Sequence, residues 1–304
     1  MATGGLARPP VWSREELKAA RDKREEAFRV AWKAEGPDAV VAACAELRPQ
    51  VEAVLKSTDN LRRIDGDIFR NDPDAWQLLR YVCAPILSEE NFWTLVGSPK
   101  SKAVRPQYAD DAAEVIVPVV DPVRFPWVKE DRAPTRTESH AAILSTVVLL
   151  AAQRIGTGAR GGASKRQEAS VAAVLAGAGY SLDGSNARIN FIDDMKRGTY
   201  SAERHVGGAK CDVPVRLRDG RLLTIECKVS IGPKNGWKRM NRETGGKAET
   251  WRAHFGAQVV TAVVIDGVFD LGCLVQAQDK QGVTIFWETD LGPLTLFLAQ
   301  CGRG

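Results

Sequence analysis

Hydrophobic and polar positions alternate most regularly between residues 213 and 229. Val213, Val215 and Leu217 place apolar side chains at alternate positions, and RDGR at 218–221 is an Asp-Gly turn signal. A second apolar-alternating run follows at 222–229. Because successive side chains of a strand point to opposite faces, Glu226 and Lys228 share one face. The pattern predicts a β-hairpin whose second strand presents an acid and a lysine side by side.

The first 134 residues show a helical pattern instead. Ser13 and Glu16 stand at capping-box spacing and precede a charged amphipathic run, which predicts a helix from residue 13. Six prolines between residues 97 and 135 then favour extended segments and a domain junction. The predicted helices are 13–36, 38–56 with a break or kink near Pro49, and 73–96 with an interruption at Pro85. We therefore expect a mainly helical N-terminal region over 1–134 and a second domain over 135–304.

The second domain mixes helical and strand patterns. We expect a buried helix over 135–156 with Thr137 as its cap, then the glycine-rich GTGARGG and a second helix over 163–180. Short strands and turns follow to about residue 230, and then a polar, basic helix. The last predicted elements are strands at 258–265, 268–275 and 283–287 and a closing helix. This order predicts an α/β fold with a mixed central sheet flanked by helices.

Composition narrows the class of protein. A chain of 304 residues with 44% hydrophobic residues can bury a substantial core. The longest apolar run, 141–153, is shorter than the roughly 18 residues of a membrane span, and the N-terminus lacks an apolar signal core. Six cysteines form no CxxC pair, which favours small core residues in a reducing compartment. We expect a soluble cytoplasmic protein with no membrane partner.

Positive charge is concentrated around the predicted hairpin. Between Arg136 and Arg252 the chain has 20 Lys and Arg residues against 11 Asp and Glu residues, a net charge of +9. The rest of the chain carries 22 against 27, a net charge of −5. Such an excess is typical of a protein that binds nucleic acid, although scattered surface lysines and arginines give the same count.

Asp212, Glu226 and Lys228 form the pattern D-x13-E-x-K. So short a pattern also occurs on ordinary wetted surfaces. Here it follows a predicted helix that carries Glu168 and precedes a basic segment, and in that order it resembles the PD-(D/E)XK nuclease superfamily. The resemblance implies a restriction-endonuclease-like fold, in which a helix precedes a hairpin bearing the acids and the lysine. Cys211 departs from the proline found at that position in the family.

The same resemblance implies roles for these residues. Asp212 and Glu226 would hold a metal ion together with the main-chain carbonyl of Cys227, and Lys228 would be the catalytic lysine. Hydrolysis of a phosphodiester needs a hard cation such as Mg²⁺, which proteins bind through one or two carboxylates. Glu168 would complete the metal shell or position water. An exposed helix acid paired with Lys165 remains the alternative reading of Glu168.

A narrower resemblance covers roughly residues 135–300. The stretches at 158–168 and 245–291 resemble the XamI-type group of type II restriction endonucleases. That group implies Mg²⁺-dependent cleavage of double-stranded DNA at a specific site. Cutting both strands of a palindrome is most simply achieved by a homodimer, since two-fold symmetry then matches protein to DNA.

Basic and amide side chains near the motif are candidates for DNA contact. Lysines suit phosphates, whereas arginine and asparagine also read base edges. A solvated helix face is the competing interpretation. The candidates are Lys165, Arg166, Lys238, Arg239, Asn241, Arg242 and Lys247. Two other functions stay open at this point: a structure-specific or repair nuclease of the same fold, and a non-catalytic DNA-binding protein.

Overall fold

The structure is a computed structural model that describes residues 6–302, with the backbone alone described for 157–161. Its contacts divide the chain into two compact units. One unit combines the chain up to Lys33 with Gly158 onward, and the other comprises Ala34–Thr157. The sequence places a boundary at residue 135, whereas the contacts group the segment before residue 34 with the C-terminal part.

The unit Ala34–Thr157 is helical, as the sequence predicts for most of this region. Trp76, Phe92 and Trp93 pack their rings against one another in its core, with centroids 5.0 to 5.2 Å apart. Its short helices are α2 (Gly66–Asn71), α3 (Trp76–Leu79), α4 (Glu89–Val96), α5 (Ala109–Ile116) and α6 (Pro126–Lys129), with 3₁₀ turns at Pro106–Tyr108 and Val117–Val119. The interruption predicted at Pro85 within 73–96 is confirmed, since residues 80–88 between α3 and α4 are not helical.

Two long helices were predicted as broken and are continuous instead. Helix α1 (Arg14–Ser57) passes through Pro49, and buried Leu47 and Val51 hold it on either side of that residue. Helix α7 (Arg136–Gly177) runs through the glycine-rich stretch. Each glycine costs a helix about 1 kcal/mol, which is too little to end one that is packed at both sides.

The caps of these helices show one success and one error. Ser13 and Glu16 form the predicted capping box, with each main-chain N–H donating to the other side chain. At the start of α7 the cap is Thr135 rather than Thr137. The hydroxyl of Thr135 accepts from the Glu138 N–H at 3.2 Å, and Glu138 accepts from the Thr135 N–H at 2.8 Å. The predicted cap lies two residues after the observed one.

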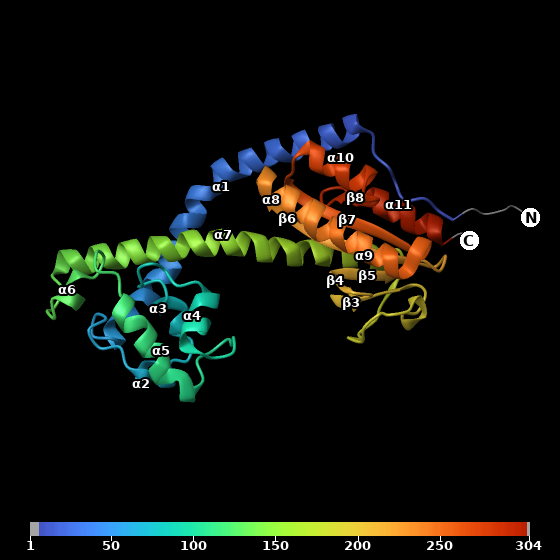
Figure 1. Ribbon diagram of the computed structural model, residues 1–304. Coiled ribbons are helices and arrows are strands. Elements are labelled where there is room, and N and C mark those ends of the chain that lie inside the picture. Colours follow the sequence, from blue (N-terminus) through green and yellow to red (C-terminus); the bar gives the residue numbers. More distant parts are fainter. Residues whose placement is uncertain (1–5, 303–304) are drawn as a thin grey trace, which may run out of the picture. The chain divides into compact units, whose positions relative to one another are not determined.

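The other unit is built on a six-stranded mixed sheet in the order β1-β2-β5-β6-β7-β8 (Figure 1). Strand β6 pairs antiparallel with β5 and parallel with β7. The strands are β1 (Ser181–Leu182), β2 (Thr199–Tyr200), β5 (Val213–Arg216), β6 (Leu222–Ile231), β7 (Val259–Val268) and β8 (Val283–Trp287), with a separate β3 (Arg204–Val206) and β4 (Ala209–Cys211) ribbon. The predicted α/β fold with a mixed sheet, flanking helices and a helical N-terminal region is confirmed.

Helices cover both faces of this sheet. On one face Leu223, Ile225 and Cys227 of β6 pack in a core with the C-terminal part of α7 and with α11 (Gly292–Cys301). On the other face the core joins β7 and β8 to α9 (Gly245–Phe255), α10 (Leu271–Asp279) and the start of α1. Every residue of β6 except Ile231 is buried, so its polar side chains lie inside the protein.

The C-terminal elements largely match the prediction. The strands near 258–265 and at 283–287 and the closing helix are present. The strand predicted over 268–275 is wrong, because Asp270 caps a helix there by accepting from the Cys273 N–H at 3.2 Å. The basic segment is helical and consists of α8 (Pro233–Trp237), a π-helix (Lys238–Thr244) and α9.

One helical segment, Arg136–Gly156, is long and apolar enough to cross a membrane by length and composition alone. The core helix of a soluble protein meets the same criterion, so this is a weak indication. All six cysteines are free thiols, and five of them are buried. They therefore act as small core residues, as the sequence predicts.

Candidate active site

The β5–β6 hairpin brings Asp212 beside Cys227 and Lys228. Main-chain pairing between the two strands ends at Val213 and Ile225, whereas β6 continues to Ile231. Beyond that point the carboxylate of Asp212 replaces a main-chain acceptor, and its Oδ2 accepts from the Cys227 N–H at 2.8 Å. The side chain of Asp212 thus takes a fixed position opposite the second strand.

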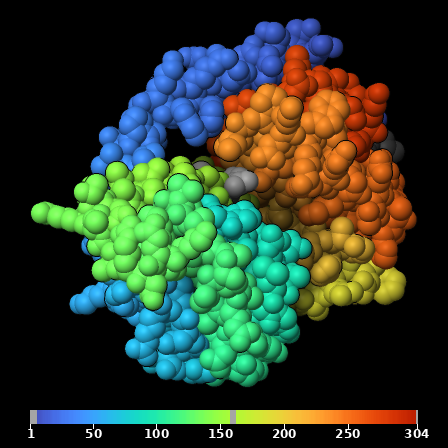
Figure 2. Space-filling view, turned by 60° about the vertical axis from the view of Figure 1, so that its left-hand side comes forward, coloured from blue at the N-terminus to red at the C-terminus, as the bar shows by residue number. Residues whose placement is uncertain are grey.

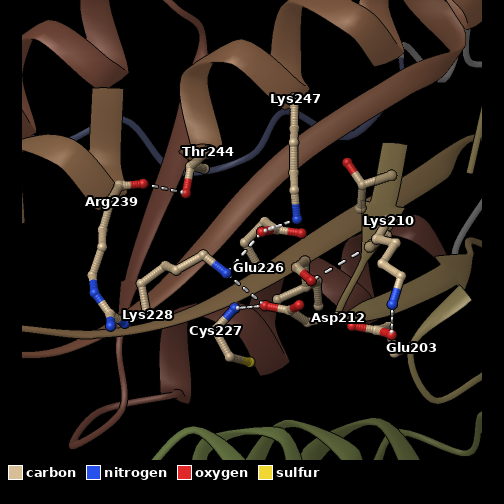
Figure 3. A network of polar contacts seen from close by, with 12 residues as sticks. Glu203, Lys210, Asp212, Glu226, Cys227, Lys228, Arg239, Thr244 and Lys247 are labelled. Carbon is tan, nitrogen blue, oxygen red and sulfur yellow. Dashed lines mark hydrogen bonds and ion pairs between the residues drawn. The ribbon is translucent and has the colours of Figure 1, made fainter. Parts of the chain in front are cut away.

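Glu226 lies at the centre of the cluster and is fully buried (Figure 3). Its Oε2 lies 2.8 Å from Lys228 Nζ and 2.7 Å from Lys247 Nζ. The same Lys228 ammonium lies 2.9 Å from Asp212 Oδ2 and so bridges the two acids. The shared face of Glu226 and Lys228, predicted from strand alternation, is the geometry that allows this bridge.

The two oxygens of Glu226 differ in their surroundings. Oε2 contacts two ammonium groups, whereas Oε1 is buried and has no hydrogen-bond partner among the described residues. A buried polar atom without a partner is costly and calls for an explanation, such as an ion. Glu226 Oε1 is therefore the atom of the cluster best suited to receive a cation.

The pKa of Glu226 and the pKa of Lys228 are both raised, for different reasons. Burial raises the pKa of Glu226, and the neighbouring Lys228 does not fully offset it. Burial acts to lower the pKa of Lys228, but Glu226 and Asp212 outweigh burial and raise it. Lys228 is therefore a protonated cation at neutral pH.

Helix α7 brings two more polar residues to this region from the opposite face of the sheet. Burial, followed by the charge of Asp212, raises the pKa of Glu168, which places the two acids within electrostatic reach. Glu168 accepts a hydrogen bond from Ser164 at 3.4 Å, and in the described part of the chain it has no ion pair with Lys165. The neighbouring Gln167 is buried and donates to the main-chain oxygen of Lys228 at 3.5 Å.

Two comparisons with known proteins bear on the family of this chain. A family model described as XamI restriction endonuclease matches residues 59–287. The type II restriction enzyme XamI of Xanthomonas campestris pv. amaranthicola is 36% identical over 192 residues, which are 60% of this chain and 69% of that enzyme. The chain belongs to the XamI restriction endonuclease family. It is therefore a restriction endonuclease by family, which implies a DNA endonuclease that acts at specific sites.

One solved structure is also similar to this chain. The crystal structure of protein VC1899 from Vibrio cholerae matches with a TM-score of 0.29 and 12% sequence identity. The match covers 86% of this chain and 58% of that one. The overlap is too loose to carry an argument about function. Family membership, by contrast, favours a soluble protein that binds DNA.

The predicted DNA contacts in this XamI-family chain fall into three groups. Lys165, Lys238 and Arg242 are exposed, and Arg239 is partly exposed. Lys238, Arg239 and Arg242 lie in the segment of α8, the π-helix and α9, which Figure 2 shows as part of the protein surface. Arg166 is exposed but pairs with Glu288 at 3.0 Å.

Two of the predicted DNA contacts are less exposed, and their side chains have partners within the protein. Asn241 is 8% exposed, and its amide donates to the main-chain oxygen of Trp237 at 3.5 Å. The structure thus places the Asn241 amide within its own helical segment. Lys247 is partly exposed, and its ammonium pairs with Glu226. Sequence reasoning missed that contact, and its available signal was the i, i+4 spacing to buried Trp251, which turns Lys247 toward the sheet.

The residues present fit Mg²⁺ better than a transition metal. Asp212 and Glu226 offer hard oxygen ligands, and Glu226 Oε1 has no other partner. Among the described residues, no group of three or more His, Cys, Asp or Glu side chains is placed to hold a metal ion. Mg²⁺ needs only one or two carboxylates, since water and substrate phosphate complete its shell.

Proposed function

We propose that this chain is a Mg²⁺-dependent type II restriction endonuclease that hydrolyses double-stranded DNA at a specific sequence. The observation that carries the proposal is the buried Glu226, whose Oε1 lacks a partner while Asp212 and Lys228 lie beside it. Family membership supplies the reaction class, and the cluster supplies the residue types that this reaction requires.

Asp212 and Glu226 would hold the cation through their carboxylates. The N–H of Cys227 faces Asp212, and in an antiparallel ladder the N–H and C=O of one residue face the same neighbour. The Cys227 carbonyl is therefore the third candidate ligand. When bound, Mg²⁺ supplies Lewis acidity and charge neutralisation at the scissile phosphate.

Lys228 would act through its positive charge. Its ammonium is held by both acids and stays protonated, so it suits stabilisation of negative charge on phosphate oxygens rather than proton abstraction. Glu168 has a raised pKa, which suits a group that orients a water molecule or exchanges a proton with it. The hairpin fixes the position of Lys228, and α7 supplies Glu168.

DNA binding would use the exposed positive charge next to the site. Lys238, Arg239 and Arg242 follow β6 directly along the chain, and Lys165 precedes Glu168 on α7. Lysine suits phosphates, and arginine also suits guanine edges. We propose that the enzyme acts as a homodimer in the cytoplasm, because two-fold symmetry matches two cuts in a palindrome.

Digestion of mapped plasmid DNA tests the proposal. The wild-type protein with Mg²⁺ should give discrete fragments, and EDTA should abolish them. Ca²⁺ should support binding without cleavage, because its looser coordination organises the reaction less tightly. A smear, nicked circles alone, or full activity in EDTA would contradict a site-specific, Mg²⁺-dependent enzyme.

A further inference from the structure

Lys247 belongs to the site although it lies outside the hairpin. It is carried by α9, whose Ala248 and Trp251 are fully buried against the sheet. The Trp251 indole donates to the Val206 carbonyl at 2.8 Å and fixes the helix further. At the start of α9, Gly245 lies directly against the Gln281 side chain. The position of Lys247 is therefore set by packing and not by a flexible loop.

The four charges of the cluster cancel. Asp212 and Glu226 contribute two negative charges, and Lys228 and Lys247 contribute two positive charges, with all N···O distances between 2.7 and 2.9 Å. A divalent cation that binds here adds two positive charges next to two ammonium groups. Like charges at this distance repel strongly inside a protein. The lysines therefore oppose cation binding as long as no further negative charge is present.

DNA supplies that negative charge. A phosphate at the site gives an ammonium group an alternative partner and lowers the net positive charge around the cation. The two lysines are not equally free to respond. The side chain of Lys228 is 11% exposed and is shared by two acids, whereas that of Lys247 is 25% exposed and contacts Glu226 alone. Lys247 is the ammonium group that can exchange a carboxylate for a phosphate.

We propose that Lys247 couples cation binding to DNA binding: it neutralises Glu226 in the free enzyme and releases this carboxylate to the cation when a DNA phosphate arrives. Lys247 is then a positioning residue that acts through Glu226. The coupling keeps the free enzyme from holding its cation tightly. By thermodynamic reciprocity, the cation also tightens DNA binding by the same factor. This inference rests on the proposed function.

Calorimetric titration of the intact protein with Ca²⁺ tests the coupling. The titration is done at mildly alkaline pH with and without a duplex that the wild-type enzyme cleaves in Mg²⁺. In the wild type, DNA should tighten Ca²⁺ binding. In Lys247→Met, Ca²⁺ binding without DNA should tighten by about fivefold or more, and the gain from DNA should shrink by a similar factor, at the lower end of common coupling strengths.

Two further variants isolate the charge of Lys247. Lys247→Arg keeps the charge and should behave like the wild type. Lys210→Met removes a matched ion pair, since Lys210 Nζ also lies 2.7 Å from a glutamate oxygen, that of Glu203. This control should leave Ca²⁺ binding unchanged with and without DNA. If Lys247→Met does not fold, Lys247→Gln carries the same expectation.

Two results would overturn the inference. One is equal Ca²⁺ affinity of the wild type and Lys247→Met without DNA. The other is an unchanged gain from DNA, with the substitution weakening DNA affinity alone, as expected for a simple phosphate contact. In either case, Mg²⁺-dependent cleavage by the wild type would leave the proposed function standing. A wild type that neither cleaves DNA nor binds a divalent cation would instead sink the proposed function.

Discussion

The two ends of the β5–β6 hairpin both hold acids against cations, and they leave different numbers of oxygens unpaired. At the turn, Asp219 Oδ1 accepts from the Arg221 N–H at 3.0 Å, and Oδ2 accepts from its guanidinium at 2.6 and 3.1 Å. At the other end, Glu226 Oε1 accepts nothing. The turn is a closed ion pair, whereas the strand end is an open one.

The two ends also differ in the direction of their pKa shifts. Burial alone would raise the pKa of Asp219, but the bonds from Arg221 outweigh it and lower the pKa. Burial dominates for Glu226 and raises its pKa. An acid beside basic side chains therefore gives a stabilising contact where every oxygen is paired and a candidate reaction centre where one is not.

The largest expected effect is a loss of cleavage activity on substitution at the open end of the hairpin. Asp212→Asn should lower the Mg²⁺-dependent cleavage rate by roughly a thousandfold or more, a loss typical of a single preorganised electrostatic group. The circular dichroism spectrum should stay unchanged, because the side chain keeps its shape. Cleavage near the wild-type rate would show that Asp212 is not part of the reaction centre.

The next largest effect is a loss of stability on substitution at the turn of the hairpin. Asp219→Asn removes charge-assisted bonds to Arg221, whose side chain is 10% exposed, and should lower the free energy of unfolding by about 2 kcal/mol. Cleavage at 25 °C should stay near that of the wild type. Urea unfolding monitored alongside digestion provides both values. Lost cleavage without lost stability would break the comparison.

Lowering the pH should destabilise the protein through Asp219, at the turn of the hairpin. The pKa of Asp219 is lower in the folded protein than in the unfolded chain, so its contribution is full above the unfolded value of about 3.9 and is lost as pH falls through the folded value. Asp219→Asn should therefore show a smaller loss of stability than the wild type on acidification. Urea midpoints of both proteins, measured across this pH range, check the expectation. Curves of midpoint against pH that run parallel for the wild type and the variant would show that it is wrong.

Local signals explain why much of this hairpin was predictable from sequence. Strand alternation and an Asp-Gly turn depend on neighbouring residues only, and both placed Glu226 and Lys228 correctly. The contact of Lys247 with Glu226 joins residues 21 apart, so only the orientation of Lys247 on its helix, and not its partner, is signalled by a short pattern. The burial of Asn241 likewise depends on packing within the folded unit.

The helices show where local patterns mislead. Proline and glycine mark breaks when neighbours do not intervene, yet α1 and α7 continue through them because buried residues hold both sides. An apolar run such as 268–275 fits a strand or a helix equally well by pattern. The Asp270 side chain caps the helix and decides between them, and an aspartate before an apolar run is a capping signal that the strand prediction passed over.

The smallest expected effects concern exposed charges beside the open end. Lys238→Ala should weaken binding to cognate and scrambled duplexes alike and reduce the salt dependence by about one counterion. Arg242→Ala, if this residue reads a base, should lose about 1 to 3 kcal/mol at one base pair. Binding measured over a salt series distinguishes them, with Lys210→Ala as the control. Unchanged values for both variants would place DNA elsewhere.

The central claim is that the open end of the hairpin, with Asp212 and Glu226 Oε1, receives the divalent cation. Anomalous diffraction from crystals grown with Mn²⁺ and a DNA duplex tests it most directly, since the signal locates the ion itself. We predict a peak in contact with Asp212 and Glu226 Oε1, and none at Asp219. A cation bound elsewhere, with both of these acids still held by lysines alone, would contradict the account.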